Sequence, residues 1–277
     1  MSEKREIRIA AESPEAVAGL KKQYLEHTTA PLDGMWLCGF VPVADHFAFM
    51  VAGRPVGYFC VNADGYLLQF FLDQEHRHEG QRLFHSMLHR AESGVGRVRG
   101  AFVSTAEPLY LSLCLDHFAE FEVNALMYQR APHLGPAEIQ PVDLRPIVER
   151  ETPDAVEFAV DAIGAPADWL RDYYGNLISR TELHGVWREG QLIALGENRL
   201  NDGIQAGCAD LGVVVGKTAR RQGLATRVLA QLAATNDARD LRSICSTEVH
   251  NVAAQKAITR AGFFPEHRIL RFRQART

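Results

Sequence analysis

The pattern of apolar and polar positions is clearest in the second half of the chain, where it predicts both helices and strands. Residues 154–177 carry apolar positions at helical spacing. Short apolar runs at 184–188 and 192–200, on either side of a Glu-Gly turn, are expected to be strands. A continuous apolar and β-branched run at 207–215 is typical of a buried strand. The pattern therefore predicts a helical region followed by three strands.

Two amphipathic helices are predicted beyond these strands. Apolar residues recur at i, i+4, i+5 and i+8 from Leu224, which is the stripe of a helix with one buried face. A short strand is expected at 243–249 before the second helix. Asn251 can cap that helix and Gly262 can end it, because asparagine accepts from free amides and glycine readily adopts the left-handed conformation.

The two halves of the chain resemble each other at two places. FLDQEHRHEGQRLFHSML aligns with VVGKTARRQGLATRVLAQ, so that Arg77 falls on Arg220 and Gly80 on Gly223. LYLSLCLDHF aligns with AAQKAITRAGF at nearly the same offset. Two matches at nearly one offset predict a duplicated domain.

The length of the chain also favours two domains, because 277 residues exceed the usual size of one hydrophobic core. The stretch APHLGPAEIQPVDLRP contains four prolines and has neither a helical nor an alternating pattern. We place the boundary there, which gives a first domain at 1–132 and a second at 133–277.

Composition narrows the range of partners. The formal net charge is -4 and neither half has an excess of basic residues, so no nucleic-acid partner is expected. The five cysteines are widely spaced and never form a CxxC pair. No carboxylate or cysteine completes a plausible set of metal ligands with the histidines at 76–89, so we expect no metal site. The first residues lack an apolar signal core and no run is long enough to span a membrane, which predicts a cytoplasmic protein without a membrane partner. The sequence does not indicate the oligomeric state.

The stretch LGVVVGKTARRQGLATRVL, residues 211–229, contains two overlapping phosphate-binding patterns. GVVVGKT at 212–218 resembles a nucleotide-binding P-loop, but it has one residue too few between its glycines, and valines favour an extended strand over a phosphate nest. The basic turn at 220–223 fits an anion site better. There a strand delivers the chain to a helix start, where free amides and the helix dipole attract negative charge.

This turn belongs to a larger pattern that resembles the GNAT superfamily of acyl-CoA-dependent N-acetyltransferases. RxxGxA at 220–225 follows an apolar strand, and after one more strand come NxxA at 251–254 and Gly-Phe at 262–263. The resemblance covers residues 186–271 well and the first half of the chain only as a degraded copy. It implies an α/β (α+β) fold of two GNAT-like domains, each a mixed, strongly twisted sheet flanked by helices, with two central strands splayed apart.

The resemblance also assigns residues of the second domain to acetyl-CoA. The apolar strand would pair with the pantetheine arm, the basic turn and helix start would hold the pyrophosphate, and an asparagine would meet the arm between the splayed strands. These candidates are Val213, Val214, Val215, Arg220, Arg221, Gln222, Gly223, Leu224, Ala225, Thr226 and Asn251. In the first domain the residues aligned with Ala225, Asn251 and Gly262 are Arg82, Ala106 and His117, in that order. We therefore expect that domain to keep the fold and to lose the cofactor.

The implied reaction is transfer of an acetyl group to a primary amine of a small molecule or a peptide. An alkyl ammonium has a pKa of about 10 and must lose a proton before it attacks, so a base is required. The candidate bases are Glu248, Asp210 and Glu197. The departing thiolate usually takes a proton from an acid, which the family often supplies from a tyrosine seven residues after the asparagine. Here that position is Ile258.

Three alternatives remain open at this point. A non-catalytic acyl-CoA sensor fits the missing tyrosine, a P-loop kinase would bind ATP with magnesium, and a pure interaction protein would bind neither nucleotide. The acceptor is not indicated, because Trp169, Tyr173 and Tyr174 of the preceding helices are more typical of a core than of a substrate wall.

Overall fold

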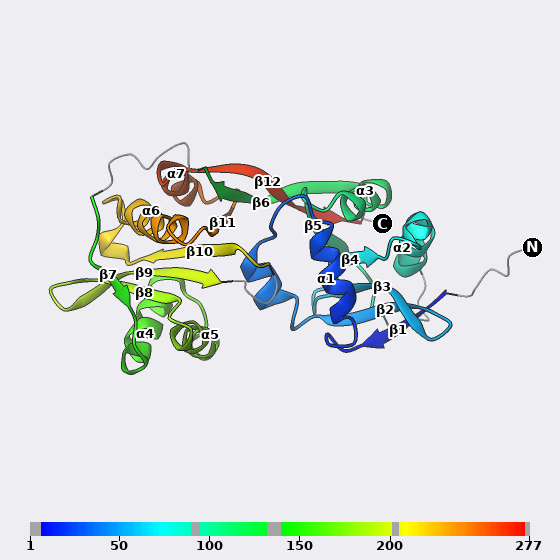
Figure 1. Ribbon diagram of the computed structural model, residues 1–277, viewed down its shortest axis with the longest axis horizontal. Coiled ribbons are helices and arrows are strands. Elements are labelled where there is room, and N and C mark those ends of the chain that lie inside the picture. The colour runs from blue at the N-terminus through cyan, green and yellow to red at the C-terminus, as the bar shows by residue number, and fades with distance from the viewer. Residues whose placement is uncertain (1–6, 90–94, 132–139, 201–204, 275–277) are drawn as a thin grey trace, which may run out of the picture. The chain divides into compact units, whose positions relative to one another are not determined.

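The computed structural model describes residues 7–89, 95–131, 140–200 and 205–274, and its chain forms two compact units (Figure 1). Unit 1 comprises Met1–Leu126 and His267–Thr277, and unit 2 comprises Met127–Glu266. Part of the proline-rich stretch at the expected boundary lies outside the described residues.

Unit 1 is built on strands in the order β1-β2-β3-β4-β5-β12. All neighbouring pairs with an assigned register are antiparallel except β4 and β5, which are parallel. Its elements are β1 (Ile7–Glu12), α1 (Ala18–Glu26), the π-helix η1 (Trp36–Phe40), β2 (Asp45–Val51), β3 (Arg54–Val61), β4 (Tyr66–Leu72), the 3-10 turn η2 (Arg77–Glu79), α2 (Gly80–His89), β5 (Gly100–Ser104), α3 (Pro108–His117) and β6 (Glu120–Arg130).

Unit 2 repeats this order of elements. Its strands follow the order β6-β11-β10-β9-β8-β7, and β6 enters it from unit 1 at Met127. Among its pairs with an assigned register, β10 and β11 are parallel. Its elements are β7 (Leu144–Pro146), the 3-10 turn η5 (Glu149–Glu151), α4 (Thr152–Ile163), α5 (Ala167–Ser179), β8 (Leu183–Arg188), β9 (Gln191–Leu200), β10 (Cys208–Val215), the 3-10 turn η6 (Lys217–Ala219), α6 (Leu224–Asp237), β11 (Arg242–Glu248), α7 (Val252–Arg260) and β12 (Phe263–Arg273). The repeated order agrees with the duplication predicted from the sequence echoes.

The last strand of the chain runs from unit 2 into unit 1. Residues Ile269–Arg273 of β12 pair with β5, and Leu270 and Phe272 belong to the hydrophobic core of unit 1. The sequence pattern assigns residues 267–277 to the second domain, whereas their contacts place them in unit 1.

The helices of unit 2 cover both faces of its sheet. α4 and α5 lie on one side of β8, β9 and β10, and α6 and α7 lie on the other (Figure 1). Leu195 of β9 packs in a core with Val156 and Tyr174, whereas Gly196 lies against Val228 and a β-carbon there would be 2.7 Å from it. The alternation of strand side chains therefore separates an α4/α5 face from an α6/α7 face.

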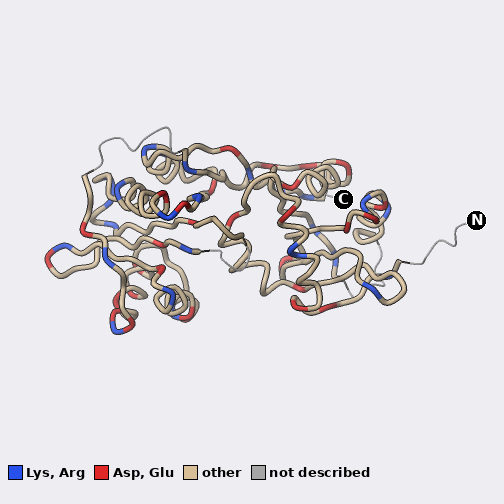
Figure 2. The backbone as a smooth tube through the Cα atoms, in the orientation of Figure 1, with Lys and Arg blue, Asp and Glu red and all other residues tan. Residues whose placement is uncertain are grey.

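The helices and strands predicted for the second half are confirmed. α6 buries the apolar stripe that starts at Leu224, Asn251 caps α7, and Gly262 follows α7 with φ 87°. Figure 2 shows basic and acidic residues interspersed along the backbone of both units. None of the helices in the described parts of the chain is long and apolar enough to cross a bilayer.

Candidate active site

The two parallel strands of unit 2 separate partway along their length. β10 and β11 are paired only where Cys208 to Asp210 lie opposite Arg242 to Ile244, whereas β10 continues to pair with β9 as far as Val215. Its last four residues, 212–215, are partly exposed. The edge of β10 beyond Asp210 therefore offers backbone N–H and C=O groups to an extended ligand that contains amides.

This separation leads to the turn before α6, whose backbone is suited to an anion. Arg221 and Gly223 both have positive φ, 63° and 73°, and no side chain caps the helix. The first helical hydrogen bond runs from the N–H of Arg227 to Gly223, so the amides of Leu224, Ala225 and Thr226 precede the helical ladder. A β-carbon at Gly223 would meet nothing within 4 Å. The amides at the helix start therefore lie beside open space, as a phosphate site requires.

The side chains of the turn are partly engaged with the protein itself. The guanidinium of Arg220 donates to the carbonyls of Ala162, at 2.7 Å, and Val215, at 3.2 Å. Gln222 donates to the carbonyl of Thr218. Arg220 thus holds the turn against the end of α4 and the end of β10, so the main-chain amides are better placed than its side chain to meet a phosphate.

The P-loop pattern in the same stretch does not form a phosphate nest. Residues 212–215 are part of β10, and neither Gly212 nor Gly216 has a positive φ. Lys217, which would reach the phosphates of a nucleotide, pairs instead with Asp161 at 2.7 Å. This conformation contradicts the P-loop alternative.

Thr226 lies in the first turn of α6, and Asn251 lies directly before α7. The side chain of Asn251 accepts from the N–H of Ala254 at 3.1 Å and so serves as a helix cap. The hydroxyl of Thr226 donates to the carbonyl of Ala257 and links the two helices. Asn251 is exposed, and Ile258, at the position of the missing tyrosine, is buried.

All three candidate bases lie on the α4/α5 face of the sheet. Asp210 is paired with Arg199 and with Ile244, and Gly212 is paired with Glu197, so alternation places Glu197, Asp210 and Glu248 on the same side. Glu197 and Asp210 are buried, whereas Glu248 is exposed at the end of β11. Glu248 thus lies across the strand separation from the other two.

Arg199 joins the two buried carboxylates. Its guanidinium contacts Glu197 at 2.5 Å and Asp210 at 3.1 Å. Burial lowers the pKa of Arg199, but the charges of Asp210 and Glu197 outweigh burial and hold that pKa well above its usual value. The arginine is therefore a permanent cation between two acids.

Tyr173 of α5 completes this network. Its hydroxyl donates to Oε2 of Glu197 at 2.7 Å and accepts from Arg199 at 2.9 Å. Burial, and after it the charge of Glu197, raises the pKa of Tyr173 above its ordinary value, so the phenol stays protonated. Sequence reasoning missed Arg199, although its position two residues after Glu197 on a strand was a signal. It placed Tyr173 in the core, and the structure shows that its polar tip binds an acid.

The corresponding turn of unit 1 is closed. Gly80 has no positive φ, and a β-carbon there would contact Leu113 at 3.7 Å. Arg82 is paired with Glu79 at 2.6 Å. β4 is buried over residues 67–72, unlike the end of β10.

An indole also covers β4 of unit 1 beyond the point where that strand parts from β5. β4 and β5 pair only at Tyr66 and Leu67, and the next carbonyl, of Leu68, accepts from the indole N–H of Trp36 at 3.4 Å. Trp36 also packs against Phe102 of β5 with ring centroids 5.3 Å apart. Side chains of unit 1 thus occupy the region that is open in unit 2.

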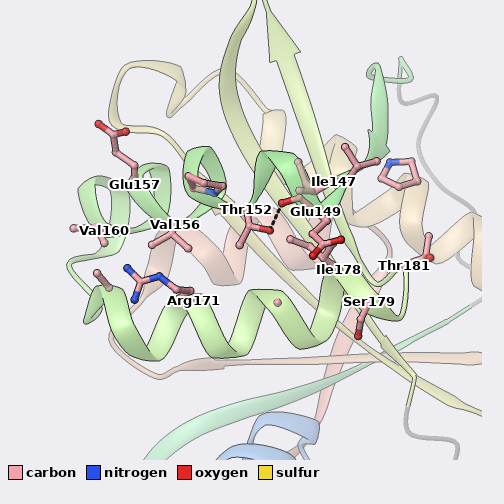
Figure 3. Close-up of a pocket in the computed structure, with 15 residues that line it drawn as sticks. Ile147, Glu149, Thr152, Val156, Glu157, Val160, Arg171, Ile178, Ser179 and Thr181 are labelled. Atoms are coloured by element: carbon pink, nitrogen blue, oxygen red, sulfur yellow. Dashed lines mark hydrogen bonds between the residues drawn. The ribbon is translucent and has the colours of Figure 1, made fainter.

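The structure also contains a groove that lies apart from the predicted cofactor and catalytic residues. A groove of about 1230 Å³ between α4 and α5 is lined by Val156, Val160 and Ile178 among others and includes none of those residues (Figure 3). Among the residues that the structure describes, no group of three or more histidines, cysteines or carboxylates is arranged to hold a metal ion.

Comparison with known proteins agrees with this arrangement in both units. Residues 13–131 match the model of the "Acetyltransferase (GNAT) domain", and residues 146–263 match that of the "Acetyltransferase (GNAT) family". No curated protein matches the chain. A solved GNAT-family acetyltransferase from Colwellia psychrerythraea is 47% identical with a TM-score of 0.92, over 96% of this chain and 99% of that one.

More distant structures share the fold. A GCN5-related N-acetyltransferase from Sphaerobacter thermophilus is 15% identical with a TM-score of 0.63, over 100% of this chain and 98% of that one. A tandem GNAT protein from the clavulanic acid biosynthesis pathway is 12% identical with a TM-score of 0.66, over 98% and 99% of the two chains. The chain belongs to the GNAT family of acetyltransferases. It carries two GNAT domains in tandem, as the sequence motifs predicted.

Proposed function

We propose that unit 2 transfers an acetyl group from acetyl-CoA to a primary amine of a small molecule or a peptide. The observation that carries the proposal is the strand separation, which exposes the edge of β10 and leads to an uncapped helix start. The pantetheine arm would pair with the backbone at Val213, Val214 and Val215, and the pyrophosphate would bind the amides of residues 220–226. Asn251 at the start of α7 would meet the arm.

The reaction requires a proton acceptor and a site for negative charge. The amine nitrogen attacks the thioester carbon, an oxyanion forms, and the C–S bond breaks to release the CoA sulfur, which takes up a proton. A backbone N–H of β10 near Val215 would donate to the oxyanion. The ammonium proton passes to a carboxylate, directly or through water.

Glu248 is our first choice as this base. It is exposed and lies on the α4/α5 face, on the strand that forms the other side of the separation. Glu197 and Asp210 are buried and both contact Arg199, so an incoming amine reaches them less readily than it reaches Glu248. Asp210 and Glu197 remain the second and third candidates.

A titration experiment tests the proposal against its alternatives. Acetyl-CoA, and separately ATP with magnesium, would be titrated into the full chain by calorimetry, and free thiol would then be followed with a panel of amines. We expect acetyl-CoA to bind, ATP not to bind, and thiol to appear with at least one amine. Binding without thiol release under any amine would instead support a sensor, and absence of both would support an interaction protein.

A further inference from the structure

α5 presents an aromatic pair on the same face as the buried acids. Trp169 and Tyr173 are four residues apart on the helix, and their rings stack with centroids 4.9 Å apart at an interplanar angle of 13°. Trp169 is 45% exposed, which is unusual for a residue of its size, whereas Tyr173 is partly buried. The pair thus leads from solvent towards the sheet.

Glu197 lies at the inner end of this pair and beside the backbone of β10. Its Oε2 accepts from the hydroxyl of Tyr173, and a β-carbon at Gly212 would lie 2.9 Å from the same oxygen. Gly212 is the second residue after Asp210, where β10 parts from β11. A group bound by Glu197 would therefore lie next to the strand edge that we assign to the pantetheine arm.

One carboxylate oxygen of Glu197 has no donor in this network. The side chains of Glu197 and Arg199 are 8% and 14% exposed. The contacts of Tyr173 and Arg199 with Glu197 both use Oε2, and no donor among the described residues contacts Oε1. A polar oxygen that is largely removed from water and has no donor is costly, and the N–H groups of a bound ammonium would satisfy it.

We propose that Trp169, Tyr173 and Glu197 form the acceptor site, and that it selects a compact cationic primary amine. The ammonium would donate to Oε1 of Glu197, and the carbon next to it would pack on the ring face of Trp169, where cation–π attraction adds to apolar contact. This inference rests on the proposed function, because it names the substrate class of the same unit. It assigns to Glu197 the recognition of the ammonium, while Glu248 takes the proton.

Binding of a matched pair of probes tests the inference without requiring turnover. Benzylamine, a cation at neutral pH, and benzyl alcohol, its neutral counterpart, would be titrated into the full chain saturated with CoA. We expect benzylamine to bind at least about tenfold more tightly than the alcohol. In Glu197→Gln this preference should disappear. In Trp169→Ala affinity for benzylamine should fall about tenfold, while the dissociation constant of acetyl-CoA stays unchanged.

A control variant separates the site from a general effect of truncation. Ile163 is an exposed apolar residue at the end of α4, 54% exposed, and Ile163→Ala should leave benzylamine binding unchanged. Equal binding of the amine and the alcohol, or an unaltered affinity in Trp169→Ala, would overturn the inference. The proposed function would survive that result if acetyl-CoA still bound and an amine still released thiol, and it would fail separately if acetyl-CoA did not bind.

Discussion

The pyrophosphate site that we propose in unit 2 depends on a single glycine. Gly223 has φ 73° and faces open space, and it lies directly before the free amides of α6. We predict that Gly223→Glu weakens acetyl-CoA binding on the order of 100-fold, because the carboxylate repels the pyrophosphate and competes for amide hydrogen bonds of about 1.5–3 kcal/mol each. Calorimetric titration measures the change.

Gly190 offers a control matched in conformation and charge. It has φ 78° in the β8–β9 turn, and a β-carbon there also meets nothing within 4 Å. Gly190→Glu therefore imposes the same kind of backbone strain and the same new charge in the same unit. Equal affinity of the two variants for acetyl-CoA would show that the pyrophosphate does not bind at the turn before α6.

The three carboxylates on the α4/α5 face differ in their partners, and this difference predicts different kinetics. Glu248→Gln should lower kcat by roughly 100-fold or more while the dissociation constant of acetyl-CoA changes little, as expected for a base that acts only in the chemical step. Steady-state kinetics at saturating amine, combined with calorimetry, measure both quantities. If kcat is unaffected, Glu248 is not the base, and Asp210→Asn is the next variant to compare.

At the scale of elements, a buried acid in unit 1 connects two helices and makes their packing dependent on pH. Glu107, directly before α3, accepts from the hydroxyl of Tyr24 on α1 and from the N–H of Ser104, at 2.6 Å, at the end of β5. Burial raises the pKa of Glu107 to about 7, although these two hydrogen bonds oppose the rise. The folded chain therefore holds this proton at a pH where the unfolded chain has lost it.

This shift gives a prediction with a definite sign. The ordinary pKa of 4.5 applies to the unfolded chain. Between pH 4.5 and about 7 the free energy of unfolding should fall as pH rises, and above about 7 the loss should be complete. Glu107→Gln mimics the protonated acid and should remove this component. Urea midpoints of unfolding from pH 5 to 8 test it. The midpoint of the variant relative to that of the parent protein should rise up to about pH 7, and a difference in midpoint that does not change with pH would contradict the assignment.

At the scale of the whole molecule, the same fold occurs twice but the open strand edge occurs once. In unit 1 the indole of Trp36 covers β4, Gly80 packs against Leu113, and Ala106 at the position of Asn251 is buried. We therefore predict one acetyl-CoA bound per chain, measured by calorimetric titration. A stoichiometry of two, with one site remaining in Gly223→Glu, would show that unit 1 also binds the cofactor.

The sequence by itself determined the elements of unit 2 and the family. Helix and strand periodicity, the Asn251 cap and the glycine after α7 are local properties, because each depends on residues a few positions apart. The RxxGxA turn is equally local, since a strand end and a helix start adjoin in the chain. For this reason the cofactor candidates at 213–226 follow together from one short stretch of sequence.

Only the tertiary structure decided which distant residues share an environment. The register of β9 on β10 brings Arg199 between Glu197 and Asp210, and helix packing places Tyr173 on the same acid. Periodicity does not encode register between separate strands, because a shift of two residues preserves the faces and changes every partner. Periodicity also does not show which strand is the partner of β12. The sequence therefore assigned β12 to the second domain, whereas pairing with β5 places its end in unit 1.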